Sequence, residues 1–237
     1  MNVNHIYFDK NKSLELKGVA IMLMLFHHCF RLQEIYRGYV ISFYPFSESN
    51  IVNIAYASKI CVSMFAFITG YGLYIMYSNK KESAQKWVAK RYLKTFSGYW
   101  FVWIVCAITF QIIDKSTTKI FFNDEIDKGI VYCVLNITGL DVLFRTPTQT
   151  AVWWYMSAAV IFILSIPIIY WFRENIWLFL AITILLSRSI LGHESVAIIS
   201  SGTSPFAFFV PVMMGCVFAR YKIFEKIHSM NVITKPE

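Results

Sequence analysis

The amino-acid sequence predicts an all-α protein, a polytopic bundle of transmembrane helices. Hydrophobic residues make up 57% of the 237 residues, and charged residues only 15%. A water-soluble domain needs more polar side chains than this to cover its surface. The apolar residues also come in blocks about as long as a bilayer is thick, so the chain divides into membrane spans.

Six apolar blocks have the length and composition of membrane-spanning helices. They run from Leu16 to Leu32, Ile51 to Tyr77, Ser97 to Ile113, Val152 to Phe172, Ile176 to Leu191 and Pro205 to Tyr221.

A seventh block, Gly129 to Phe144, is weaker. Asn136, Thr138, Gly139 and Asp141 interrupt it, and a lipid-facing helix tolerates such residues poorly. The pattern predicts either a short span or a re-entrant segment.

Loop charges favour the re-entrant alternative, because short cytoplasmic loops collect Lys and Arg. The basic segment Ser78 to Lys94 is predicted inside, and so is the N-terminus; the acidic segment Asp114 to Asp127 is then outside. A full span at the seventh block would put the basic tail around Lys222 outside, against the rule. We therefore expect a multi-pass protein of the plasma (inner) membrane, with six spans, one re-entrant segment and both termini cytoplasmic. Asp141 and Arg145 should be reachable from the outer side.

The net charge of +8 is mostly a signal of this topology. A basic inner face also suits membrane lipids with anionic headgroups, or a phosphorylated cytosolic ligand. No Lys/Arg-rich soluble module is present for nucleic-acid binding. The five cysteines are scattered singly, without the spacing of a metal site, so no metal is expected.

The first apolar block carries the most informative residues, because ionisable side chains within a membrane helix usually face a cavity or the bundle interior. Lys17 and His28 are eleven residues apart, which returns to within roughly 20° of the same helix face after a rise of about 16 Å. His28 is a candidate general base, and Lys17 a candidate anchor for a negatively charged ligand. His27 points about 80° away, and a hydrogen bond to a neighbouring helix explains it best.

Two further features could contribute to a site or simply to packing. Gly70 and Gly72 permit a close helix approach or a local break, beside the hydroxyl of Tyr71. Trp153 and Trp154 lie where a span enters the membrane from outside, which an aromatic belt explains; the alternative is an acceptor site lined by these rings.

Four segments in order resemble a known family. LKGVAIMLMLFHHCF, SKICVSMFAFITGYGLY, KRYLKTFSGYW and WWYMSAAVIFILSIPII are similar to the successive motifs of the acyltransferase-3 family of bacterial membrane O-acyltransferases. The family's first motif is a basic residue, ten residues, then His, which Lys17 and His28 fit. Its SGY-like element is here Thr69 to Tyr71.

The resemblance implies transfer of an acyl group, usually acetyl, from cytosolic acyl-CoA to a hydroxyl of an extracytoplasmic polysaccharide. His28 would take the role of the essential histidine, with Lys17 as its basic partner. The donor's phosphates would meet the basic residues before the third span. Tyr71, within the SGY-like element, and Trp154, from the possible acceptor site, are the predicted substrate-binding residues. The predicted donor-binding residues are Lys90, Arg91 and Lys94.

The family typically has about ten spans. We therefore expect residues 1–237 to form a single acyltransferase-3-like membrane domain that is incomplete at its C-terminal end.

Three alternatives remain open. The chain could be a glycan transporter or export component, which also needs a polar cavity but no acyl donor. It could be an inactive fragment of the acyltransferase. A membrane-bound O-acyltransferase of the unrelated His/Asn type fits less well, because His193 lies in a short loop on the outer side.

Overall fold

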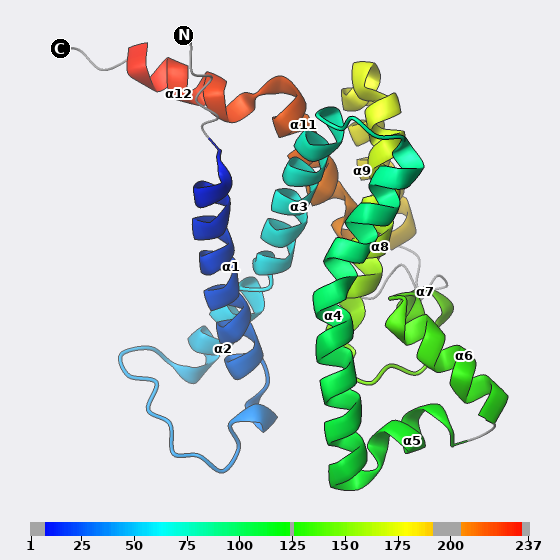
Figure 1. Ribbon diagram of the computed structural model, residues 1–237. Helices are drawn as coiled ribbons and strands as arrows, with labels where there is room; N and C mark the ends of the chain where they lie inside the picture. The colour runs from blue at the N-terminus through cyan, green and yellow to red at the C-terminus, as the bar shows by residue number, and fades with distance from the viewer. Residues whose placement is uncertain (1–7, 124–125, 192–204, 234–237) are drawn as a thin grey trace. The chain divides into compact units, whose positions relative to one another are not determined.

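A computed structural model describes residues 8–123, 126–191 and 205–233 (Figure 1). Regular secondary structure in these ranges is entirely helical, which confirms the all-α prediction. The chain divides into two compact units. Unit 1 comprises residues 1–72 and 211–237, and unit 2 comprises residues 73–210; each is described by itself. His193 lies outside the described residues.

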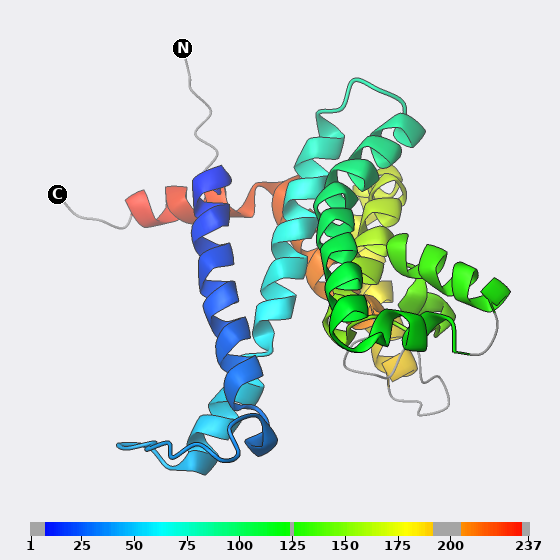
Figure 2. The ribbon, with the colours of Figure 1, turned by 60° about the horizontal axis from the view of Figure 1, so that its bottom comes forward.

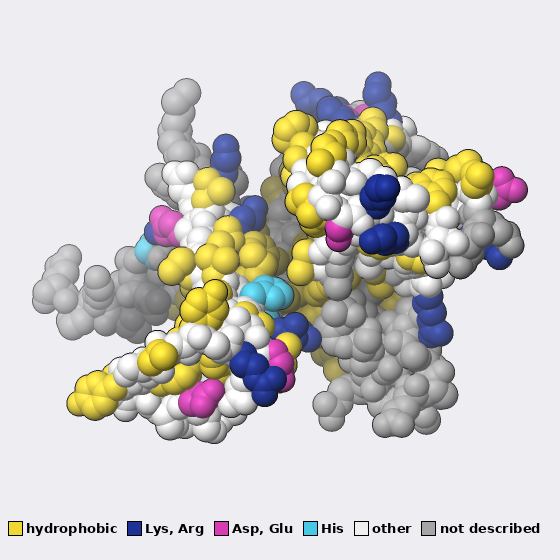
Figure 3. Space-filling view, turned by 90° about the horizontal axis from the view of Figure 1, so that it is seen from below, with side chains coloured by type: hydrophobic (Ala, Val, Ile, Leu, Met, Phe, Trp, Pro, Cys, Tyr) yellow, Lys and Arg dark blue, Asp and Glu magenta, His cyan; other side chains and the backbone are white. Residues whose placement is uncertain are grey.

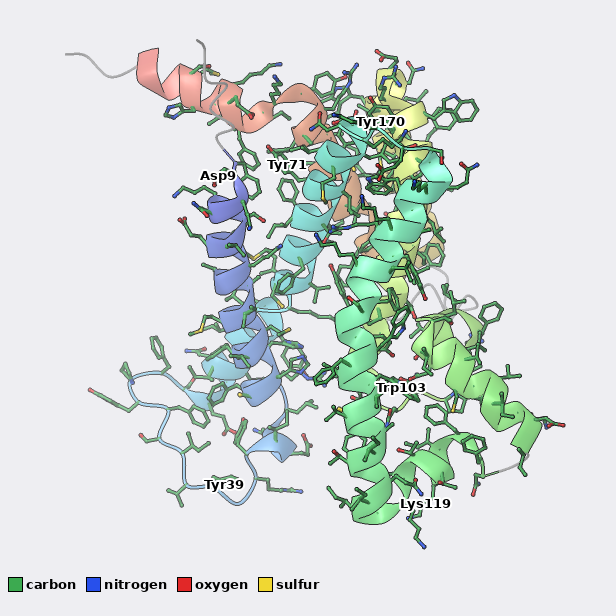
Figure 4. All side chains as sticks on the ribbon, in the orientation of Figure 1. Asp9, Tyr39, Tyr71, Trp103, Lys119 and Tyr170 are labelled. Carbon is green, nitrogen blue, oxygen red and sulfur yellow. The ribbon has the colours of Figure 1, made fainter. Side chains whose placement is uncertain are left out.

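Unit 1 begins with the long helix α1, Lys10–Phe30 (Figure 4 labels its cap, Asp9). The Asp9 carboxylate accepts a hydrogen bond from the backbone N–H of Lys12 at 2.9 Å, which satisfies one of the free donors of the first turn. From Val19 to Phe30 the helix contains no Gly or Pro, and most of its residues are apolar. A short 3-10 helix, η1 (Gln33–Ile35), follows.

The chain returns through α2 (Glu48–Ala57) and α3 (Ile60–Ser78). Ser47 caps α2, and a break of two residues at Ser58 and Lys59 separates the two helices. Together they form one candidate span of 31 residues, Glu48–Ser78. The Tyr71 end of α3 belongs to unit 1, and the helix continues into unit 2.

Unit 1 is completed by α11 (Phe209–Tyr221), from Pro211 onward, and α12 (Ile223–Ile233). A Cβ atom at Gly70 would lie 2.1 Å from the Val212 carbonyl oxygen, and one at Gly215 would lie 2.2 Å from the Phe67 carbonyl oxygen. The backbones of α3 and α11 therefore touch at glycine, which is the first of the two alternatives that Gly70 left open. Gly72 has no heavy atom within 4 Å of its Cβ position and contributes nothing to this contact.

The first described residue of the chain meets the start of the last helix in unit 1. The ring of Phe8 stacks on that of Phe224, with centroids 4.7 Å apart. The start of α1 and the start of α12 therefore lie at the same end of the unit. The cytoplasmic location of both termini stays a prediction.

Unit 2 contains the second long helix, α4 (Ala84–Asp114). It begins 13 residues before the predicted start at Ser97. Its first turns therefore contain four of the basic residues expected in a loop, namely Lys86, Lys90, Arg91 and Lys94. Ser83 caps it by accepting a hydrogen bond from the Lys86 N–H at 3.4 Å. The Ala, Lys, Arg and Leu residues that follow favour helix, so α4 extends beyond its apolar part.

The segment between α4 and α8 (Trp154–Trp171) consists of short helices. These are α5 (Ser116–Phe121), α6 (Ile126–Ile137), α7 (Asp141–Phe144) and the 3-10 helix η2 (Ala151–Trp153). Gln149 donates to the Thr117 hydroxyl at 3.1 Å, so the segment ends near where it began. At the other end of α8, Tyr170 lies 5.2 Å from Tyr77. The segment therefore starts and ends at one end of unit 2, as a re-entrant or surface segment would.

The predicted accessibility of Asp141 is wrong. Its side chain is only 2% exposed, whereas Arg145 is exposed. Asp141 turns inward because Asn136 and Ser157 offer it hydrogen bonds, which no local sequence pattern shows.

The rest of unit 2 comprises η3 (Arg173–Asn175), α9 (Ile176–Leu191) and η4 (Pro205–Phe208). All six predicted apolar blocks contain helix. Among the described residues, however, four helices qualify as spans by length and composition, or five if the bent pair Phe206–Tyr221 and Ile223–Met230 counts as one. The exposed faces carry many apolar side chains (Figure 3), as lipid contact requires.

Candidate functional site

Lys17 and His28 lie on the same continuous helix of unit 1. Since α1 is unbroken from Lys10 to Phe30, their helical spacing of about 16 Å and their shared face hold as predicted. His28 is exposed and Lys17 is half-buried. The face that packs within unit 1 is a different one, marked by the buried residues Ala20 and His27. The face that carries Lys17 and His28 is therefore not the packed face at the level of His28, and the His28 imidazole is accessible.

His27 is anchored to the neighbouring helix. Its Nδ1 atom lies 2.7 Å from the carbonyl oxygen of Ala55 in α2, and its side chain is 7% exposed. Because a carbonyl oxygen only accepts hydrogen bonds, Nδ1 carries the proton. The prediction that His27 bonds to a neighbouring helix is confirmed.

Tyr71 lies on α3 near the described N-terminal segment (Figure 4). Its side chain is 4% exposed, and its ring is 5.0 Å from that of Phe8 and 5.7 Å from that of Phe224. These two rings cover Tyr71 in unit 1. Its contact with substrate stays a prediction.

The three predicted donor-binding residues line one pocket of unit 2. Lys90, Arg91 and Lys94 extend from the first turns of α4 into a cavity of about 360 Å³ at the α3–α4 turn. Lys80 and Lys81 lie on its other wall, which makes five cations against one carboxylate, Glu82. The remaining lining residues are Met76, Asn79 and Trp87.

Arg91 is the least satisfied of these cations. Its Nε atom is buried without a hydrogen-bond partner, and Nη1 reaches only the Met76 sulfur, at 3.7 Å. A thioether is a weak acceptor for a guanidinium group. By contrast, Lys90 lies 3.8 Å from Glu82, and Lys80 lies over the Tyr77 ring. The pocket therefore offers charge and free donors to a ligand with several anionic oxygens.

Trp154 stands at the start of α8 in unit 2. Its ring is 5.3 Å from that of Phe208 and 5.8 Å from that of Tyr155. It is half-buried, so one part of the indole remains open to a ligand. Its role in acceptor binding stays a prediction.

A buried polar network in unit 2 escaped the sequence analysis as a group. Asn136 donates to Asp141 at 3.0 Å and to Thr148 at 3.2 Å, and Ser157 donates to Asp141 at 3.2 Å. Trp103 (Figure 4) donates to the Asn136 side-chain oxygen. Burial raises the pKa of Asp141 above its usual range, although hydrogen bonds from the Thr148 and Ser157 hydroxyls oppose the shift. The network holds α4, α6, α7 and α8 together.

The chain matches one known protein family over most of its length. The acyltransferase-3 family model, described as an acyltransferase domain, matches residues 11–233. The chain belongs to the acyltransferase-3 family. No curated protein and no solved structure matches it. The match extends over both units, and the two residues of the family's first motif, Lys17 and His28, lie on α1 within it.

Acyltransferase-3 membership makes the chain a membrane acyltransferase in general terms. Within this framework the structure brings together Lys17 and His28 on one helix, and Lys90, Arg91 and Lys94 in one pocket. Lys80, Lys81 and Glu82 were read from the sequence only as loop residues, although they lie within ten positions of KRYLK. No cluster of three His, Cys, Asp or Glu side chains able to hold a metal ion occurs in the described ranges.

Proposed function

We propose that this acyltransferase-3 protein moves an acetyl group from cytosolic acetyl-CoA to a hydroxyl of an extracytoplasmic polysaccharide. The hydroxyl oxygen attacks the thioester carbonyl, a C–O bond forms and the C–S bond breaks. The hydroxyl proton passes to His28 and from there to the departing CoA thiolate, so the histidine ends the cycle neutral.

One observation carries this proposal, namely that Lys17 and His28 share one face of α1 at different depths. An acyl donor with a long pantetheine arm places its anionic part and its thioester far apart. A cation near one end of the helix and a titratable imidazole about 16 Å further along suit these two parts. The exposure of His28 in unit 1 leaves room for both reactants.

The basic pocket at the α3–α4 turn supports the choice of donor. Coenzyme A carries a pyrophosphate and a ribose 3′-phosphate, and a pocket with five cations on two walls suits such a ligand. The unpartnered Nε of Arg91 supplies a donor for a phosphate oxygen. The cations of this pocket would contact phosphate oxygens of coenzyme A.

The test compares a deletion strain with its parent by NMR of the wall and capsule glycans. We expect the loss of an O-acetyl signal, restored by the wild-type gene and not by a His28→Ala gene. Unchanged acetylation with glycan retained inside the cell would favour an export function instead. Unchanged acetylation together with unchanged export would indicate an inactive protein. Either of these two outcomes would contradict the proposal.

A further inference from the structure

The chain turns sharply at the end of α11 in unit 1. The helices Phe206–Tyr221 and Ile223–Met230 are bent by 61°, and Lys222 between them has a φ of 50°. A lysine rarely adopts this left-handed conformation, so the turn is a defined feature of the backbone. As a result α12 does not prolong α11. It runs across the end of α1 in Figures 1 and 2.

One face of α12 is fastened to unit 1 by Phe224. Its ring stacks on Phe8 at 4.7 Å and lies 5.2 Å from Phe218 and 5.7 Å from Tyr71. Two other apolar residues of the helix, Ile227 and Met230, are 48% and 66% exposed. The start of α12 lies at the end of α1, which is a candidate membrane span. A helix at the end of a span that exposes apolar side chains has the properties of an interfacial helix.

The same turn gathers positive charge. An open pocket of about 410 Å³ is lined by Arg220, Tyr221, Lys222, Glu225, Lys226 and Ser229. Lys222 and Lys226 are exposed, and in the described part of the chain neither lies within ion-pair distance of a carboxylate.

One carboxylate, that of Glu225, lines the pocket beside three cations, Arg220, Lys222 and Lys226, so positive charge is in excess. The Oε2 atom of Glu225 is buried without a hydrogen-bond partner. The pocket at the turn therefore keeps a positive potential toward its open side.

We propose that the α11–α12 turn binds the phosphate headgroup of an anionic membrane lipid. Lys222 and Lys226 bind the phosphate, and Ile227 and Met230 enter the acyl-chain boundary next to it. A soluble phosphate compound would satisfy the lysines equally well, but it would leave the two apolar side chains in water. The lysines and the exposed apolar side chains occur together at one end of unit 1, and this combination favours a lipid.

The experiment uses the full chain, purified in detergent and reconstituted in vesicles of phosphatidylcholine with or without phosphatidylglycerol. Retained lipid is identified by native mass spectrometry, and the preference for phosphatidylglycerol is measured. The test variant is Lys222→Gln with Lys226→Gln. The matched control is Lys115→Gln with Lys119→Gln, a pair with the same spacing outside this turn.

We expect wild type and control to prefer phosphatidylglycerol. In the test variant this preference should be about tenfold lower, since each basic residue near an anionic surface changes lipid binding several-fold. Lys222→Arg with Lys226→Arg should retain it, which separates loss of charge from loss of fold. Equal lipid preference in the test variant and the control would overturn the proposal. Displacement of phosphatidylglycerol by inorganic phosphate or coenzyme A would overturn it too, in favour of a soluble ligand.

Discussion

The Nδ1 atom of His27 lies 2.7 Å from the carbonyl oxygen of Ala55, whereas the next residue, His28, is exposed. Adjacent histidines thus have different environments, and their variants should fail differently. His27→Ala leaves a buried carbonyl group without its donor and should cost about 1–3 kcal/mol of stability. His28→Ala should change stability by less than about 0.5 kcal/mol, as expected for an exposed position.

Thermal unfolding of both variants in detergent checks this prediction. The folded fraction of His27→Ala should keep most of the transfer activity. A larger loss of stability in His28→Ala than in His27→Ala would contradict the packing described for α1.

The contact between α3 and α11 makes a second prediction. Gly70→Ala or Gly215→Ala would drive a methyl group into backbone atoms 2.1–2.2 Å away, so the helices must separate. We expect each variant to lose about 1–3 kcal/mol of stability. Gly72→Ala is the matched control, because nothing lies within 4 Å of its Cβ position. It should be neutral or slightly stabilising, since Ala favours helix. Equal melting temperatures for all three variants would rule out the close contact.

The buried carboxyl group of Asp141 predicts a pH dependence. Because burial raises its pKa above the ordinary value of 3.8, the folded state holds this proton more tightly than the unfolded state. The contribution of the Asp141 carboxyl group to the free energy of unfolding therefore falls as the pH rises from about 4 to the pKa of the folded state. Above that pKa the contribution is constant. Asp141→Asn should remove this part of the pH dependence and be less harmful at pH 7 than Asp141→Leu, which leaves Asn136 and Ser157 without a partner.

Melting temperatures between pH 4 and pH 8 provide the measurement. The melting temperature of Asp141→Asn should increase relative to that of wild type as the pH rises. If that difference were independent of pH, Asp141 would not titrate in this range, and the raised pKa would be wrong.

The basic pocket makes a prediction about donor binding. Arg91→Gln should weaken the binding of acetyl-CoA about tenfold or more, the usual worth of a charge-assisted hydrogen bond. Glu82→Gln should strengthen it, because it frees Lys90 and removes a like charge. Lys86→Gln, on the same helix but not lining the pocket, is the control. Calorimetric titration at constant ionic strength gives the affinities. Equal affinities for the Arg91 and Lys86 variants would place the donor elsewhere.

Hydrophobic periodicity predicted the positions of the helices and the shared face of Lys17 and His28, whereas the re-entrant course of the segment before α8 stays a prediction. The start of α4 was missed because Ser83 caps a helix whose first turns are polar. The network around Asp141 was missed because its hydrogen bonds join residues up to 33 positions apart, as between Trp103 and Asn136. Likewise, only the packed structure shows that Gly70, and not Gly72, meets α11.

The most direct test of the proposed acyl transfer is the rate at which purified protein in proteoliposomes transfers labelled acetyl from acetyl-CoA to surface glycan, compared between wild type and His28→Ala. We expect the variant to be slower by about 10² to 10⁴ with nearly unchanged affinity for the donor, because proton transfer contributes to rate and little to binding. Lys17→Ala should instead weaken donor binding, and Lys17→Arg should be tolerated. A His28→Ala protein that transfers acetyl at the wild-type rate, beside an inactive His27→Ala protein, would contradict the assignment.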